Sequence, residues 1–236
     1  MFWWRDEVRP GVSVAFTDTG AGNLALHVGD DPGEVKARRI RLDEAAKLGA
    51  LSFNYMDQVH GNNVAMIPAD GPAPTADAMV AEPGRPGTVQ PLAVMVADCV
   101  PVVLVGEAAG GTPVIAVAHA GRPGVASAVV PATVRKMRTV GAENISAWLG
   151  PSICGSCYEV PDQMRADVAA VVPSAWSTTA WGTPALDLPA GVRAQLEELD
   201  VPVKYFGECT LETGSLYSYR RDSRTGRFAG LVWTHD

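Results

Sequence analysis

Two histidines and one cysteine offer the most reactive combination of side chains in this sequence. His60 lies in the polar stretch 58–63, while Cys99 and His119 each follow a short apolar run. Two imidazoles and a thiolate can fill three of the four tetrahedral positions around zinc and leave the fourth for water or substrate. Zinc held in this way lowers the pKa of its bound water and supplies a nucleophile near neutral pH. His60, Cys99 and His119 are therefore the predicted metal ligands and the predicted catalytic residues.

Each of these residues also has a simpler interpretation. A single histidine at the end of an apolar strand is more often structural, and a single cysteine more often packs as a small apolar group. The separations of 39 and 20 residues match no compact zinc motif. Without a metal, Cys99 could act as a nucleophile with His119 as its base, as in a cysteine hydrolase or deamidase. A third interpretation is a metal-binding or scaffold protein without catalytic activity.

Short apolar segments must position Cys99 and His119. The runs 92–96 and 114–118 are rich in valine and are followed by polar residues or glycine. Such short runs predict strands that are buried on both faces. Each strand would present one reactive side chain at or near its end, on a rigid scaffold that suits an active site.

The remaining pattern mixes helices and strands. Asp31, Pro32 and Glu34 form a helix-start signal with a capping box, and Gly49 is the expected end of that helix. We expect further helices over 126–140, 161–172 and 191–199, and further strands over 143–149, 201–206 and 228–233. No repeat or charged linker divides the sequence, and no regular βαβ period is present. We therefore predict one α+β domain, residues 1–236, with mixed sheets flanked by helices.

The composition restricts the partners and the location of the protein. The net charge is −7 and no cluster of basic residues is present, so we expect no nucleic-acid binding. No apolar run reaches 18 residues, and we expect no membrane span. The first ten residues lack a basic stretch followed by an apolar core, so no secretory signal is expected. A cytoplasmic protein with reduced thiols is the prediction.

A second cysteine pattern, Cys154-Gly155-Ser156-Cys157, could indicate a redox centre or a zinc site. No second pair of this kind exists to complete a site with four thiolates, and the motif does not follow the strand-to-helix entry of a thioredoxin-like protein. We therefore expect these two thiols to be packing residues. Cys209 is assigned no role.

Several ordered strings resemble the laccase-domain family, also called YfiH-like proteins and formerly multicopper polyphenol oxidases. The main matches are Gln58-Val59-His60-Gly61, Ala97-Asp98-Cys99 with Pro101-Val102, and Ala118-His119-Ala120-Gly121. Further matches run along most of the chain: Asn23-Leu24, residues 27–32, Arg39, residues 75–78, Leu149-Gly150-Pro151, Tyr158-Glu159-Val160, Cys209-Thr210, residues 218–222 and Thr225-Gly226-Arg227.

The sequence departs from the family pattern in two places. Arg122-Pro123 stands where the family usually has a Trp-Arg pair, and the arginine-and-glycine signature expected before Asn23 is replaced by residues 17–22. Neither change touches the predicted metal ligands. Both changes put the substrate preference and the shape of the nearby loops in question.

The resemblance implies a YfiH-like fold and a zinc enzyme that acts on purine nucleosides. Similar family members phosphorolyse adenosine, inosine or methylthioadenosine, which is a transferase reaction, and also deaminate adenosine, which is a hydrolase reaction. Zinc deaminases use a carboxylate as general acid and base, and Asp77, Asp98 and Glu159 lie in the matching motifs. Arg39 and Arg220 are the expected phosphate ligands. The expected partners are thus a small nucleoside and phosphate, with Asn23 and Asp77 as further predicted substrate-binding residues.

Other reactions at the same site remain alternatives. One is the hydrolysis of misincorporated serine from cell-wall precursors, and another is a polyphenol oxidase-type activity with copper in place of zinc. A multicopper laccase is excluded for a single chain, because a type 1 copper and a trinuclear cluster together need more than the four histidines present. Copper at the His-Cys-His site is still chemically reasonable.

Overall fold

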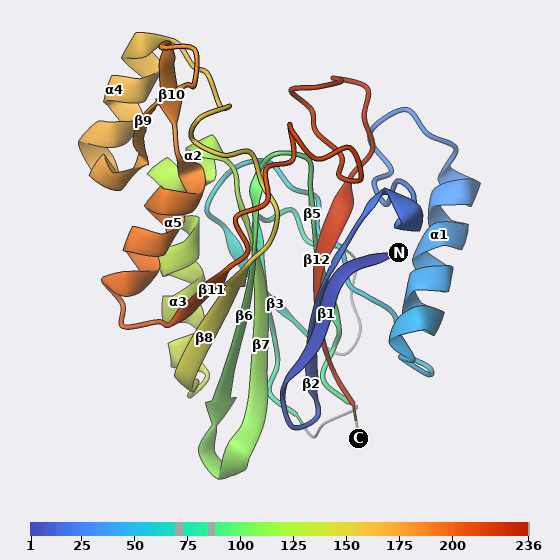
Figure 1. Ribbon diagram of the computed structural model, residues 1–236. Helices are drawn as coiled ribbons and strands as arrows, with labels where there is room; N and C mark the ends of the chain where they lie inside the picture. Colours follow the sequence, from blue (N-terminus) through green and yellow to red (C-terminus); the bar gives the residue numbers. More distant parts are fainter. Residues whose placement is uncertain (69–72, 85–87, 236) are drawn as a thin grey trace.

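Two β-sheets pack face to face, and helices cover the outer face of each sheet (Figure 1). The computed structural model describes residues 1–68, 73–84 and 88–235. The smaller sheet has four antiparallel strands in the order β1 (Phe2–Arg9), β2 (Val12–Thr17), β12 (Phe228–Thr234) and β5 (Leu92–Val96).

The larger sheet has six strands, in the order β11 (Val203–Tyr205), β8 (Glu143–Leu149), β6 (Val100–Ala108), β7 (Thr112–Ala120), β4 (Ala78–Ala81) and β3 (Val64–Ile67). The pairs β11–β8 and β3–β4 are parallel, whereas the other pairs are antiparallel. A separate antiparallel pair is formed by β9 (Trp176–Thr178) and β10 (Pro184–Leu186). The large sheet is therefore mixed, as predicted, whereas the small sheet is antiparallel throughout.

Helices flank both sheets. The small sheet is covered by α1 (Pro32–Ala46), and the large sheet by α2 (Arg122–Ala126), α3 (Val129–Thr139), α4 (Asp162–Val171) and α5 (Leu188–Glu197) (Figure 1). Short 3-10 helices lie at Thr19–Ala21, Ala109–Gly111 and Pro173–Ala175. No helix within the described ranges is both long enough and apolar enough to cross a membrane.

Strand β6 shows why the central strands are apolar on both faces. Val102 and Leu104 pack in the core beneath the helices, while Val103 and Val105 pack in the core between the two sheets. Successive side chains of a strand point to opposite faces, and both faces are buried here. The α+β prediction and the strands predicted at 92–96, 114–118 and 143–149 are confirmed.

Helix boundaries differ from expectation at identifiable residues. Asp31 caps α1 by accepting the Glu34 backbone N–H. The helix ends at Ala46, earlier than expected, because Lys47 already adopts the left-handed conformation two residues before Gly49, whose φ is also positive. The helix expected from 126 begins only at Val129. Pro131 thus falls in the first turn of α3, where its missing N–H has no helical partner to lose.

Gly150 is buried against Phe16, and substitution of this glycine is expected to destabilise the fold. A Cβ at Gly150 would lie 2.3 Å from Cδ1 of the fully buried Phe16 ring. Because that ring is enclosed by the core, Gly150→Ala should destabilise the protein by about 3 kcal/mol, at the upper end of overpacking effects. The melting temperature should fall by about 6–12 °C. In thermal unfolding, Gly214→Ala is the control, because nothing lies within 4 Å of its added Cβ; equal melting temperatures would contradict the packing.

Candidate active site

Cys99 lies where the chain passes from one sheet to the other. Strand β5 of the small sheet ends at Val96, and β6 of the large sheet begins at Val100. The turn needs a positive φ of 86° at Asp98. The Asp98 carboxylate accepts hydrogen bonds from the Thr210 hydroxyl at 2.6 Å and the Arg220 backbone N–H at 2.7 Å. These bonds hold a conformation that is costly for a residue other than glycine and fix the position of Cys99.

His119 lies near the end of β7, opposite Pro101 of β6, and is 3% exposed. Its ring Nδ1 is 2.8 Å from the Asp77 carboxylate. An ionised carboxylate only accepts hydrogen bonds, so Nδ1 carries the proton and donates it. The second ring nitrogen, Nε2, is then the one that can bind a metal ion.

The same aspartate holds the loop that carries His60. Asp77 is fully buried and accepts the backbone N–H of His60 at 2.8 Å and that of Gly61 at 2.6 Å. His60 itself has a positive φ of 61°. Burial alone would raise the pKa of Asp77, but hydrogen bonds from His119 and the loop outweigh it and lower this pKa. One carboxylate thus positions two of the three predicted ligands.

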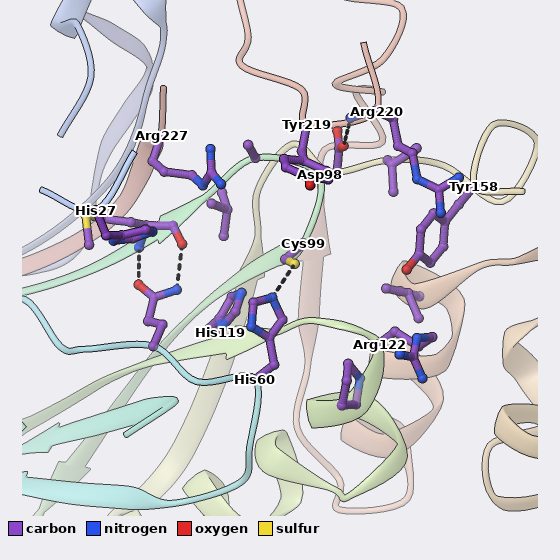
Figure 2. Close-up of a pocket in the computed structure, with 17 residues that line it drawn as sticks. His27, His60, Asp98, Cys99, His119, Arg122, Tyr158, Tyr219, Arg220 and Arg227 are labelled. Carbon is purple, nitrogen blue, oxygen red and sulfur yellow. Dashed lines mark hydrogen bonds between the residues drawn. The ribbon is translucent and has the colours of Figure 1, made fainter. Parts of the chain in front are cut away.

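The three ligand groups converge on one small space (Figure 2). Cys99 Sγ is 3.9 Å from His60 Nε2, and the three ligand atoms lie within 4.8 Å of one another. Tetrahedral bonds of about 2.3 Å to sulfur and about 2.0 Å to nitrogen separate such atoms by about 3.5 Å. A Cβ on Gly121 would approach His60 Cδ2 to 2.8 Å and Cys99 Sγ to 3.1 Å, so the glycine keeps this space open. The donor set and its spacing fit zinc.

Cys99 and His119 are electrostatically coupled. Burial favours the neutral form of each side chain, but their mutual attraction outweighs it. The pKa of Cys99 falls to about 6, and that of His119, which also bonds Asp77, rises to about 9. Cys99 is therefore a thiolate near neutral pH, which is the form that binds metals and the form that attacks electrophiles.

The centre forms the floor of a cavity of about 460 Å³, a size that suits a small-molecule ligand. Its walls combine apolar, aromatic and cationic side chains: His27, Gln58, His60, Met95, Val96, Ala97, Asp98, Cys99, His119, Arg122, Pro123, Ile153, Tyr158, Leu188, Tyr219, Arg220 and Arg227. Two of the arginines lie against tyrosine rings, with Arg220 Cζ 4.7 Å from the Tyr158 centroid and Arg227 Cζ 5.9 Å from the Tyr219 centroid.

The structure brings only Arg220 of the four predicted substrate-binding residues into the wall of the cavity. Asn23 lies behind the wall, and all hydrogen-bonding positions of its side-chain amide are used. Its Nδ2 donates to the Ala25 carbonyl and to the Asp30 carboxylate, and its Oδ1 accepts the backbone N–H groups of Ala25 and Arg227. An amide with every partner used has none left for a nucleoside.

Arg39 and Asp77 also lie behind the wall. The Arg39 guanidinium donates to the Leu24 carbonyl through Nε and Nη2 and stacks 3.6 Å above the Tyr55 ring. It reaches the cavity only indirectly, through a 3.7 Å contact with the Met95 sulfur. Asp77 bonds His119 and the His60 loop, as described above. Neither residue is among those that line the cavity; Arg39 contacts its wall through Met95, and Asp77 bonds two of the predicted ligand residues.

Sequence reasoning gave no role to several residues of the cavity. Arg122, Tyr158, Tyr219 and Arg227 all line it. Tyr158, Tyr219 and Arg227 belong to strings that resemble the family: Tyr158-Glu159-Val160, residues 218–222 and Thr225-Gly226-Arg227. That resemblance is the feature of the sequence that could have identified them as functional residues. Arg122 is the departure from the family pattern, and its guanidinium has no hydrogen bond or ion pair with any described residue.

The three carboxylates considered for proton transfer have different surroundings. Asp98 lines the cavity beside Cys99. Asp77 is buried behind His119, and the Glu159 carboxylate accepts a hydrogen bond of 2.7 Å from Trp181 Nε1 and lies outside the cavity. Asp98 is therefore the one of the three whose position allows contact with a ligand.

Known proteins share both the sequence and the architecture. The family model described as multi-copper polyphenol oxidoreductase laccase matches residues 7–235. A purine nucleoside phosphorylase of Streptomyces coelicolor is 47% identical over 249 residues, covering 99% of each chain. The purine nucleoside phosphorylase YfiH of Escherichia coli is 37% identical, covering 89% of this chain and 85% of its own. The crystal structure of a Neisseria meningitidis DUF152 protein superposes with a TM-score of 0.85 at 31% identity, covering 100% of this chain and 99% of that one.

Proposed function

The chain belongs to the laccase-domain, YfiH-like family, and on this basis we propose that it is a zinc-dependent purine nucleoside enzyme. The proposed reactions are phosphorolysis of adenosine, inosine or methylthioadenosine and deamination of adenosine. The observation that carries the proposal is the convergence of His60, Cys99 and His119 on the floor of a cavity that also holds three arginines.

Each group of cavity residues has a distinct task in this proposal. Tyr158 and Tyr219 offer ring faces for the base, while Arg220 and the unpaired Arg122 attract phosphate. His60, Cys99 and His119 would hold the zinc ion, which when bound supplies Lewis-acid polarisation of water or of a substrate oxygen. Asp98, at the cavity wall, would accept or return a proton through the lone pairs that its bonds to Thr210 and Arg220 leave unused.

Asn23, Arg39 and Asp77 act as positioning residues in this scheme. The Asn23 side chain accepts the backbone N–H of Arg227 at 2.9 Å and so fixes the backbone of Arg227, whose side chain lines the cavity. Arg39 supports Met95, which also lines it. Asp77 orients His119 and the His60 loop.

A nucleoside panel with and without inorganic phosphate tests the function. Only when phosphate is present do we expect free base and ribose 1-phosphate from adenosine or inosine, and adenine and 5-methylthioribose 1-phosphate from methylthioadenosine. Inosine from adenosine without phosphate would report the deaminase reaction. If the products do not exceed those formed by the His60→Ala variant, the purine nucleoside proposal is wrong.

Asp77→Asn is expected to lower metal affinity and activity about 10- to 100-fold. Loss of a carboxylate that hydrogen-bonds a metal-binding histidine usually has an effect of this size. An amide has one acceptor oxygen, whereas Asp77 uses both oxygens for His60, Gly61 and His119. Metal titration and steady-state kinetics measure the effect. Asp162→Asn is the matched control, because its carboxylate is 73% exposed and pairs only with Arg165 among the described residues; equal loss in both variants would reject the positioning role.

A second candidate function follows from the Cys99–His119 pair. A thiolate with a lowered pKa beside a protonated imidazole is the arrangement of a cysteine nucleophile and its acid–base partner. A metal-free hydrolase or deamidase of this type would keep its activity after exhaustive chelation. The zinc enzyme would lose activity on chelation and regain it on adding zinc, so this one comparison separates the two candidates.

A further inference from the structure

Three cysteines and a glutamate form a second cluster, outside the cavity of the active site. One ligand atom from each of Cys154, Cys157, Cys209 and Glu212 lies within 4.8 Å of all the others. The first two residues come from the loop after β8, and the other two from the loop after β11. The fourth group is a carboxylate, which explains why a search for a second cysteine pair does not reveal the cluster.

Each loop contributes a tight turn with two ligands three positions apart. The Cys154 carbonyl accepts the backbone N–H groups of Cys157 and Tyr158, both at 3.0 Å. The Cys209 carbonyl accepts the N–H of Thr213 at 3.0 Å. Turns of this kind bring the first and fourth side chains to one side, so the motifs Cys-x-x-Cys and Cys-x-x-Glu face a common point. Paired motifs of this spacing are typical of structural zinc sites.

Backbone bonds hold the two turns against each other without help from any ion. The Ser152 N–H donates to the Glu208 carbonyl and the Thr210 N–H donates to the Ser152 carbonyl, both at 3.1 Å. Arg221 Nη1 also donates to the carbonyls of Thr210 at 2.8 Å and Thr213 at 3.2 Å. These carbonyls flank Glu212, so the segment that carries it is fixed.

The surroundings differ from those of the active site. Cys157 and Cys209 are each 7% exposed and pack with Ile153, whereas Glu212 lies at the exposed side. None of these three cysteines forms a disulfide. The Glu212 carboxylate has no hydrogen bond or ion pair with any residue that the structure describes. Four protein ligands close a tetrahedral site, which distinguishes a structural zinc from a catalytic zinc with an open position.

We propose that Cys154, Cys157, Cys209 and Glu212 form a second, structural site for a zinc ion. Binding replaces the three thiol protons with metal–sulfur bonds and releases those protons to solvent, with no change in oxidation state. The ion would join the loop that carries Tyr158 to the segment that leads to Arg220. Both of these residues line the cavity, so the site would stabilise one wall of the active site without touching substrate.

Metal analysis of variants tests the proposal. We expect two zinc ions per chain in the native protein purified with zinc and without chelators. Cys157→Ser and Cys99→Ser should each retain one, and the double variant none. The two single variants remove different sites, so failure of the second site is distinguishable from failure of the active-site zinc. Equal zinc content in Cys157→Ser and the native protein overturns the proposal.

Cobalt substitution supplies a readout that needs no cysteine substitution at the second site. In the Cys99→Ser background, cobalt should still give the strong near-ultraviolet sulfur-to-metal absorption of a tetrahedral site with several thiolates. Glu212→Gln, at an exposed position, should weaken cobalt affinity at least 10-fold. Absence of this absorption, or a Cys154–Cys157 or Cys154–Cys209 disulfide in protein prepared with reductant, would overturn the zinc site.

Discussion

His60→Ala is expected to reduce phosphorolysis about a thousand-fold and to remove the metal ion from the active site. A bound cation contributes several kcal/mol to a transition state that gains negative charge. A loss of about 4 kcal/mol corresponds to a factor of about a thousand in rate. His60 is exposed and lies on a loop that Asp77 holds through backbone N–H groups, so removal of the imidazole should leave the fold intact.

The measurement combines kcat/KM for nucleoside phosphorolysis with metal analysis of the same preparation. His235→Ala is the matched control, because this histidine bonds Ser13 near the end of β12 and lies outside the cavity. The control should keep its active-site metal and most of its activity. Full activity in a His60→Ala protein that has lost the metal would reject the metal-dependent mechanism.

Gly121→Ala is expected to have a comparable effect, although it removes no functional group. The backbone at Gly121, with φ −74° and ψ 170°, suits alanine, so the substitution introduces no strain in the main chain. The added Cβ would instead lie 2.8 Å from His60 and 3.1 Å from Cys99. One of the two ligands must move, and displacement by a few tenths of an ångström disturbs a tetrahedral site.

We expect at least a hundred-fold loss of activity with a melting temperature close to that of the native protein. Isothermal titration with zinc, thermal unfolding and nucleoside kinetics check the three parts of this expectation. Gly214→Ala controls for the chemical change, because its Cβ would meet nothing within 4 Å. If Gly121→Ala keeps native activity and zinc affinity, the three ligands do not meet where the structure places them.

The sequence pattern predicted β5, β7, β8, β11 and β12, which include the edge strands β5 and β11, but it missed the buried strands β2, β4 and β6. The runs at β5 and β7 are apolar throughout, because both of their faces are covered. Strand β1 contains Arg5, Asp6 and Glu7 and lies at the edge of the small sheet, so its charges hid it from hydrophobic periodicity. Strand β6 was overlooked because Pro101 interrupts the pattern at its start.

At the site, residue type predicted the reactive groups but not the supporting ones. His60, Cys99 and His119 converge, and their roles stay predictions until metal and activity are measured. The sequence predicts substrate contact for Asn23 and Arg39, whereas the structure shows their side chains bonded to backbone carbonyls and N–H groups, partners that sequence does not reveal. The cysteine–glutamate cluster depends on two loops separated by 52 residues between Cys157 and Cys209, a contact that only the fold creates.

The hydrogen bonds of Asp77 have a consequence for the order of events during maturation. They fix the His119 ring and the His60 backbone, so the binding of the proposed zinc ion would cost little conformational entropy. On the proposed zinc-dependent mechanism, the chain would fold first and bind the metal ion afterwards. An exchange experiment with isotopically labelled zinc would show this as rapid, reversible loading at the active site while the chain stays folded throughout.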